Sequence, residues 1–302
     1  ISSPGAAAVH SFLVQATRTP MLVANVPRAH QGPSTRPPAV AGLFYPQEPE
    51  QMARMLDKLC PTEPVGREPW KAALVPHAGW VYSGRIAADV LRRIQYPQRI
   101  IVLGPKHTSL GVEWAVAPCE AWSLPDLTVP SDRALAERLC GAIEGLQLDA
   151  QAHQQEHAIE VELPLLARFA PQARVVGLAI GNSSLERCQE FGRGLAEVLR
   201  QEEGPTLLVI SSDMNHYASD SETRRIDARA IEALETRDPE TVYRTVRDNH
   251  ISMCGVLPAC IVLECLRQLG PVSRAEKVAY GTSADVSDDT SRVVGYAGML
   301  FA

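Results

Sequence analysis

The sequence predicts an α/β protein: a three-layer sandwich with a mixed, mostly parallel central sheet and helices on both faces. Four β-branched, almost uncharged runs carry this prediction, because strands buried on both faces of a parallel sheet have that composition. They lie at 72–76, 99–103, 174–180 and 206–211. Segments with helical spacing alternate with these runs, which is the order of elements in α/β folds.

The helices follow from caps, spacing and prolines. Acids in the first turn favour a helix over 48–59, and a Ser-Asp cap begins one over 131–144. A helical segment from about 156 to 169 contains Pro164, which should kink or divide it. The other expected helices are 85–94, 184–200, 220–236, 239–248 and 255–269.

The end of the chain predicts the antiparallel part of the sheet. Residues 277–283 and 292–301 read as two strands with an Asp-rich connection between them. They are close enough in sequence to pair antiparallel, which makes the sheet mixed.

One domain accounts for most of the 302 residues, because the middle of the chain shows no linker, repeat or change of composition. Residues 1–36 are rich in Ala, Pro and Ser and poor in acids. We expect residues 1–36 to be a disordered or loosely docked extension and residues 37–302 to form a single α/β domain.

Composition excludes several functions. A net charge of −6 and a pI of about 5.8 argue against non-specific nucleic-acid binding and against binding to an anionic membrane surface. No apolar stretch reaches the roughly 18 residues of a membrane span. Seven cysteines without a CxxC pair indicate reduced thiols and a cytoplasmic protein.

Chemistry-bearing side chains follow the predicted strands at the point where each strand ends. His77 and His107 come after the first two, and Asp213 and His216 come after the fourth. Ligands bind outside the carboxyl ends of the strands in open α/β sheets, so these residues should share one edge. The pattern predicts a metal site or an acid–base site, in which Asp213 orients His216.

Two further signals are weaker. Glu156-His157 opens a predicted helix, and Cys254 precedes another, where backbone N–H groups would favour a thiolate. Each has a plain structural alternative: an ordinary polar first turn for the pair and a small buried hydrophobe for the cysteine. Asp213 and His216 could likewise be a helix cap and a surface histidine. Two imidazoles and a thiolate together suit iron, copper or zinc far better than magnesium or calcium.

The set of motifs resembles the MEMO family, known in bacteria and archaea as the AmmeMemoRadiSam system protein B. The resemblance runs from about Arg36 to the C-terminus. The segments that carry it are Pro38–Pro46 (PAVAGLFYP), Val75–Gly84 (VPHAGWVYSG), Leu103–His107 (LGPKH), Glu156–Glu160 (EHAIE), Ser211–His216 (SSDMNH) and Cys254-Gly255.

The resemblance implies a fold similar to the LigB-type class III extradiol dioxygenases. It implies a metal site of His77, His107 and Cys254, holding iron (Fe²⁺) or copper rather than zinc, with Asp213, His216 and His157 in the same pocket. The dioxygenases use a glutamate where this chain has the cysteine, which argues against extradiol ring cleavage. The resemblance also implies an AMMECR1-type protein and a radical SAM protein as partners.

The leading hypothesis is a non-haem metal-dependent oxygenase-like or oxidoreductase enzyme. His216 would be the acid–base residue, and His157 would bond an unidentified small-molecule or peptide substrate. The alternative is a non-catalytic module that binds a peptide or protein in a vestigial active-site cleft. A zinc hydrolase stays open as a third possibility, because a His₂Cys site with one open position is a known zinc arrangement.

Overall fold

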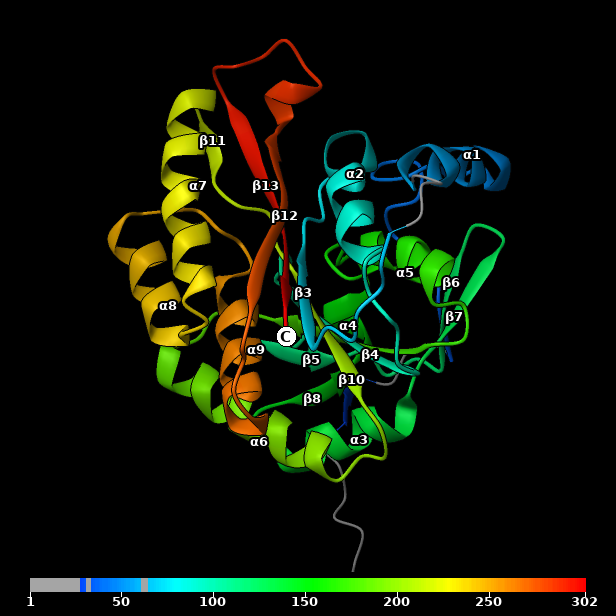
Figure 1. Cartoon of the computed structure of the whole chain (residues 1–302). Coiled ribbons are helices and arrows are strands. Elements are labelled where there is room, and N and C mark those ends of the chain that lie inside the picture. The colour runs from blue at the N-terminus through cyan, green and yellow to red at the C-terminus, as the bar shows by residue number, and fades with distance from the viewer. Residues whose placement is uncertain (1–27, 31–33, 61–64) are drawn as a thin grey trace, which may run out of the picture.

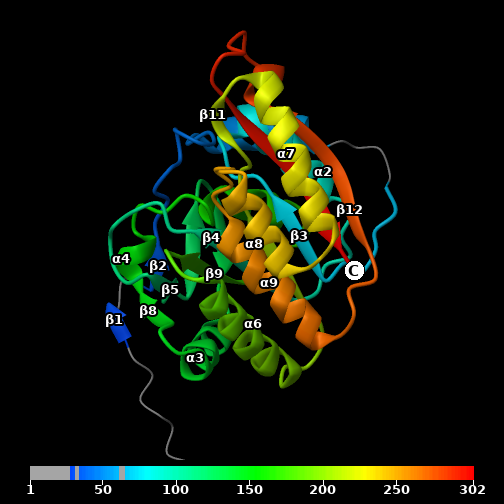
Figure 2. The same cartoon turned by 90° about the vertical axis from the view of Figure 1, so that its left-hand side faces the viewer.

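A computed structural model describes residues 28–30, 34–60 and 65–302 and shows three layers (Figure 1). A mixed sheet forms the middle layer, with helices packed against both of its faces (Figures 1 and 2). The fold class predicted from the sequence is therefore confirmed.

The central sheet has ten strands among the described residues, in the order β1-β8-β5-β9-β4-β10-β3-β13-β11, with β12 beside β13. The strands β9, β4, β10 and β3 are parallel neighbours, whereas β13 runs antiparallel to β3, β11 and β12. The bounds are β1 (Arg28–His30), β3 (Ala72–Val75), β4 (Arg99–Pro105), β5 (Trp114–Val116), β8 (Gln147–Asp149), β9 (Arg174–Ile180), β10 (Thr206–Ser211), β11 (His216–Ala218), β12 (Ala275–Thr282) and β13 (Val293–Phe301).

Side-chain alternation along the central strands creates two cores. In β3, Ala72 and Leu74 face one layer of helices, and Ala73 and Val75 face the other. All four are completely buried, which is why the sequence of this strand is continuously apolar instead of alternating.

Each core is completed by its own helices. One face is covered by α1 (Pro49–Leu59), α2 (Trp80–Leu91) and α5 (Leu163–Phe169), which Figure 1 shows on its right-hand side. The other face is covered by α3 (Arg133–Ala142), α6 (Leu185–Arg200), α7 (Asp220–Glu235), α8 (Pro239–Asp248) and α9 (Val256–Leu269), most of which stand in front in Figure 2.

The helix expected from about 156 to 169 is divided. An irregular segment carries Glu156 and His157, a 3-10 turn follows at Glu160–Glu162, and α5 begins at Leu163 with Pro164 in its first turn. A proline is tolerated there because the first N–H groups of a helix have no partner within it. The irregular segment is what brings the Glu-His pair to the edge of the sheet.

Short strands extend the fold upstream of the predicted boundary at residue 37. Thr35–Arg36 forms β2, which lies beside a hairpin of β6 (Ala121–Leu124) and β7 (Leu127–Pro130), and Arg28–His30 pairs with β8. The folded part of the chain therefore includes residues assigned to the extension, whereas residues 1–27 lie outside the described part. Among the described residues, no helix is long and apolar enough to cross a membrane.

Candidate metal centre

The carboxyl ends of β3, β4 and β10 place three predicted site residues at one edge of the sheet. His77 follows β3, His107 follows β4, and Asp213 follows β10, which lies between the other two strands. Asp213 accepts a hydrogen bond at 2.9 Å from the backbone N–H of His77, so two of these strand ends are joined directly. The strand-end prediction of a shared edge is confirmed for this pair.

Three imidazoles meet at this edge. One ring nitrogen from each of His77, His107 and His157 lies within 4.8 Å of the other two, a group that can hold a metal ion. The rings of His107 and His157 stack with centroids 4.3 Å apart, and His77 meets both edge-on at 5.2 and 5.3 Å. His157, predicted to line the pocket, is thus part of the imidazole cluster itself.

Hydrogen bonding fixes the protonated nitrogen of His77. Its Nδ1 lies 2.7 Å from the Ser211 hydroxyl, and that hydroxyl donates its own proton to the carbonyl of Ala158 at 2.5 Å. Because the hydroxyl has one proton, Nδ1 of His77 must be the donor in their contact. The Nε2 of His77 therefore keeps its lone pair, as a metal ligand requires.

A buried carboxylate does the same for His107. The Nδ1 of His107 donates to Glu156 at 2.9 Å, and its backbone N–H donates to the other carboxylate oxygen at 2.5 Å. Backbone N–H groups of His157 and Ala158 complete the set at 2.9 Å each. A carboxylate cannot donate when ionised, so Nε2 of His107 is the free nitrogen.

Burial and mutual repulsion oppose the protonation of His77 and His157. Burial lowers the pKa of His77 to about 3, with the neighbouring His107 adding to the effect. Burial likewise lowers the pKa of His157, helped by His77 and His107. Burial would raise the pKa of Glu156, but hydrogen bonding and the charge of His107 more than reverse that and lower it. Neutral imidazoles beside an ionised carboxylate are the protonation states that metal binding needs.

Cys254 touches the cluster through His77. Its Sγ lies 3.4 Å from Nε2 of His77 and accepts a hydrogen bond from the backbone N–H of Asp213 at 3.2 Å. Burial raises the pKa of the Cys254 thiol, and the charge of Asp213 raises it further. The hydrogen bond from the Asp213 N–H acts in the opposite direction, as expected for a thiol before a helix, but it does not outweigh these two effects.

His216 has a different partner from the one expected. Its Nδ1 lies 2.9 Å from the carbonyl of Ser252, and its backbone N–H donates to the Ser252 hydroxyl at 2.7 Å. The Asp213 carboxylate instead receives the backbone N–H of His77, and its burial raises its pKa while the charge of His216 opposes that rise. The loop that carries Cys254 therefore orients His216.

A segment near the N-terminus holds the His157 loop in place. Arg36 donates to the carbonyls of His153 and Glu156 and forms a buried ion pair with Glu160. Eight residues further on, the ring of Phe44 packs on His157 with centroids 4.5 Å apart. The outer side of the imidazole cluster is thus covered in part by this segment.

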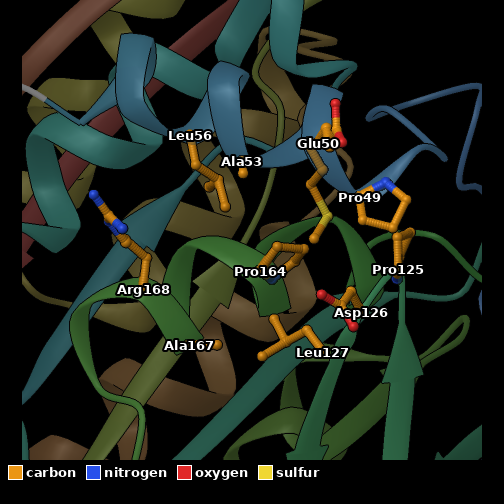
Figure 3. Close-up of a pocket in the computed structure, with 11 residues that line it drawn as sticks. Pro49, Glu50, Ala53, Leu56, Pro125, Asp126, Leu127, Pro164, Ala167 and Arg168 are labelled. Atoms are coloured by element: carbon orange, nitrogen blue, oxygen red, sulfur yellow. The ribbon is translucent and has the colours of Figure 1, made fainter.

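A separate hollow of about 390 Å³ lies between α1, α5 and the β6–β7 turn (Figure 3). Figure 3 shows apolar side chains on both helices, with Glu50, Asp126 and Arg168 as its charged members. It contains neither histidine nor cysteine, and Arg168 is engaged by Asp57. The imidazole cluster is therefore the better candidate for chemistry.

Comparison with known proteins matches this architecture to one family. The family model described as Memo-like protein matches residues 36–300. The chain belongs to the Memo-like family. The MEMO1 family protein of Aquifex aeolicus is 40% identical over 88% of this chain and 98% of its own length. The corresponding protein of Archaeoglobus fulgidus is 35% identical over 88% and 99%.

One solved structure is also similar to this Memo-like protein. It is an uncharacterised protein, JW3007, of Escherichia coli K12, with a TM-score of 0.48 and 16% identity. The match covers 75% of this chain and 98% of that one.

Sequence reasoning missed the residues that orient the site. Glu156, Ser211 and Ser252 each bond a histidine named from the sequence, but none was given a role there. Glu156 lies 49 residues after its partner His107, so no local spacing connects them. The only available signal was the acid placed directly before His157.

Proposed function

We propose that this Memo-like protein is a non-haem, metal-dependent redox enzyme of the oxygenase or oxidoreductase type, with iron or copper as its metal. The observation that carries the proposal is the cluster of three imidazoles beside a cysteine, in which the Nδ1 atoms of His77 and His107 are anchored by hydrogen bonds. This donor set fits a first-row transition metal, because neutral nitrogens and a sulfur suit iron and copper better than magnesium or calcium.

His77 and His107 would hold the metal through Nε2, and Cys254 would be the third ligand after losing its thiol proton. When bound, the metal supplies electron transfer to and from substrate or oxygen. A bound cation next to the thiol favours its ionised form, which overcomes the effect of burial on its pKa. Metal uptake should therefore release a proton from Cys254.

The remaining residues would handle protons and substrate. The Nε2 of His216 is free to take or give a proton, because its Nδ1 donates to the Ser252 carbonyl. His157 would hydrogen-bond the substrate. It also lies close enough to the other two imidazoles to rival Cys254 for the third ligand position.

Metal analysis after anaerobic purification tests the proposal. We expect about one equivalent of iron or copper per chain, lost in His77→Ala and His107→Ala variants that stay folded. A wild-type protein that binds only zinc would support the hydrolase alternative. A protein that binds none of these metals would overturn the proposal.

A second function, binding without catalysis, is favoured by exposed apolar side chains near the site. Leu43 and Val81 are 80% and 66% exposed, and Tyr82 is 45% exposed. They lie close to Phe44, whose carbonyl accepts the first backbone N–H of α2. A binding module would hold its ligand equally well with and without metal, whereas the enzyme would turn over only when loaded.

A further inference from the structure

A series of hydrogen bonds, which the proposed function does not use, leads toward His216 from the buried Asp227. Tyr280 on β12 donates to Asp227 at 2.8 Å, and the other oxygen of Asp227 accepts the backbone N–H of Asn215 at 2.9 Å. The Asn215 carbonyl accepts from the backbone N–H of Gly295 at 2.8 Å. Asp227 is completely buried, so α7, β12 and β13 together fix the backbone of Asn215.

The side chain of Asn215 then reaches the loop before Cys254. Its Oδ1 accepts from the backbone N–H of Ser252 at 3.3 Å and from the Ser252 hydroxyl at 3.0 Å. Its Nδ2 lies 3.4 Å from the hydroxyl of Thr223. A backbone N–H can only donate, so the atom that faces it must be the amide oxygen.

Ser252 in turn holds His216 at two points. Its hydroxyl accepts the backbone N–H of His216 at 2.7 Å, and its carbonyl lies 2.9 Å from Nδ1. A carbonyl only accepts, so Nδ1 carries the proton and Nε2 has the free lone pair. The position of Ser252 therefore decides which ring nitrogen of His216 can act as a base.

We propose that Asn215 is a positioning residue that holds Ser252 in place and thereby fixes His216 in the tautomer whose free nitrogen is Nε2. The use of that nitrogen as a base rests on the proposed function. The tautomer itself is a property of the metal-free protein, so the two can fail independently.

The test is nitrogen NMR of the metal-free, full-length chain labelled with ¹⁵N-histidine at pH 8, with the His216 signals identified by their loss in His216→Ala. In the wild type, the two ring nitrogens should show one protonated and one unprotonated shift. In Asn215→Leu, these two shifts should move toward each other as the tautomers mix. Amide exchange at Ser252 should become about tenfold faster, because one hydrogen bond is lost.

Two matched variants separate positioning from general stability. Asn215→Asp keeps an acceptor oxygen toward Ser252 and should restore the wild-type tautomer. Thr223→Val removes only the contact to Nδ2 and should leave the tautomer unchanged. If Asn215→Leu does not fold, Asn215→Ala, in which water can occupy the vacated volume, takes its place.

Retention of the wild-type tautomer in Asn215→Leu, or in Asn215→Ala where that variant replaces it, would overturn the inference. Equal mixing of the two tautomers in Thr223→Val would overturn it as well. Binding of Co²⁺, followed separately by its absorption spectrum, reports on the metal site. A wild type that shows the expected tautomer but binds no Co²⁺ would contradict the proposed function and leave the role of Asn215 intact.

Discussion

Glu156→Gln should weaken metal binding although Glu156 is not itself a proposed ligand. The carboxylate accepts four hydrogen bonds, two of them from His107. A glutamine has one acceptor oxygen, so its NH₂ group must face at least one of these donors. With the oxygen toward Nδ1 of His107, the backbone N–H of His107 is left without a partner.

The structure sets the expected magnitude. A buried donor without a partner costs about 1–3 kcal/mol, and the remaining bonds lose the help of a full charge. Relief from burying that charge offsets part of this loss, so we expect unfolding free energy to fall by about 2–3 kcal/mol. Removing the partner that orients a ligating histidine typically costs 10- to 100-fold in metal affinity, and we expect a loss in that range.

Glu160→Gln is the matched control. Glu160 is also completely buried and also accepts four hydrogen bonds, from Arg36, Ala39, Val40 and Tyr45, but none from a histidine. Denaturant unfolding of the metal-free variants measures stability, and anaerobic Fe²⁺ competition with a chelator measures affinity. Both variants should lose stability, and Glu156→Gln should lose far more affinity than Glu160→Gln. Equal loss of affinity in the two would refute the reasoning.

Three further outcomes follow from the site and its surroundings. Cys254→Ser should weaken iron or copper binding, because a hydroxyl ionises poorly, whereas Cys260→Ser should leave metal binding unchanged and act, if at all, through core packing. Equal metal loss in both variants would indicate an effect on folding. His216→Ala should keep its metal but lose about 10²–10⁴-fold in turnover, the usual worth of positioned proton transfer; a folded variant without metal would make His216 a ligand. Burial raises the pKa of Asp227 to about 6, so the folded protein binds the proton more tightly than the unfolded chain and stability falls as pH rises toward 7. Asp227→Asn removes this dependence, so the unfolding free energy of the variant relative to wild type should increase by about 2 kcal/mol between pH 4.5 and 7. Denaturant unfolding at both pH values measures it. A difference between variant and wild type that is the same at both pH values would contradict the raised pKa of Asp227.

The sequence could predict the strands that are buried on both faces, because such strands are continuously apolar. The run containing Ile100 and Ile101 has apolar side chains for both cores, and its neighbours share that composition. Short strands away from the centre of the sheet leave no such mark. Thr35–Arg36 has two residues and buries one of them, and two of the three residues of Gln147–Asp149 are polar, so neither could be told from a loop.

The site residues also differ in how far the sequence could predict their positions. His77 and His107 were predictable because each immediately follows a buried strand, and parallel neighbours end at the same edge. His157 entered the pocket only through the motif it belongs to, because a divided helix, not a strand, carries it there. The partner of His216 was not predictable, since Ser252 lies 36 residues away and its decisive atom is a backbone carbonyl.

Arg36 belongs to the folded domain because its positive charge balances the buried carboxylate of Glu160. Without its guanidinium, Glu160 would keep a negative charge at a completely buried position, and two carbonyls of the His157 loop would lose their donor. Shortening the chain to begin at Pro37 would therefore loosen the His157 loop as well as remove β1 and β2. A chain that begins at Ser34 would keep β2 and Arg36, and so would keep this loop in place. Hydrogen exchange at Ala158 in the two shortened proteins would show it. Arg36, the last residue removed in the shorter chain, is the counter-ion of the loop that carries His157.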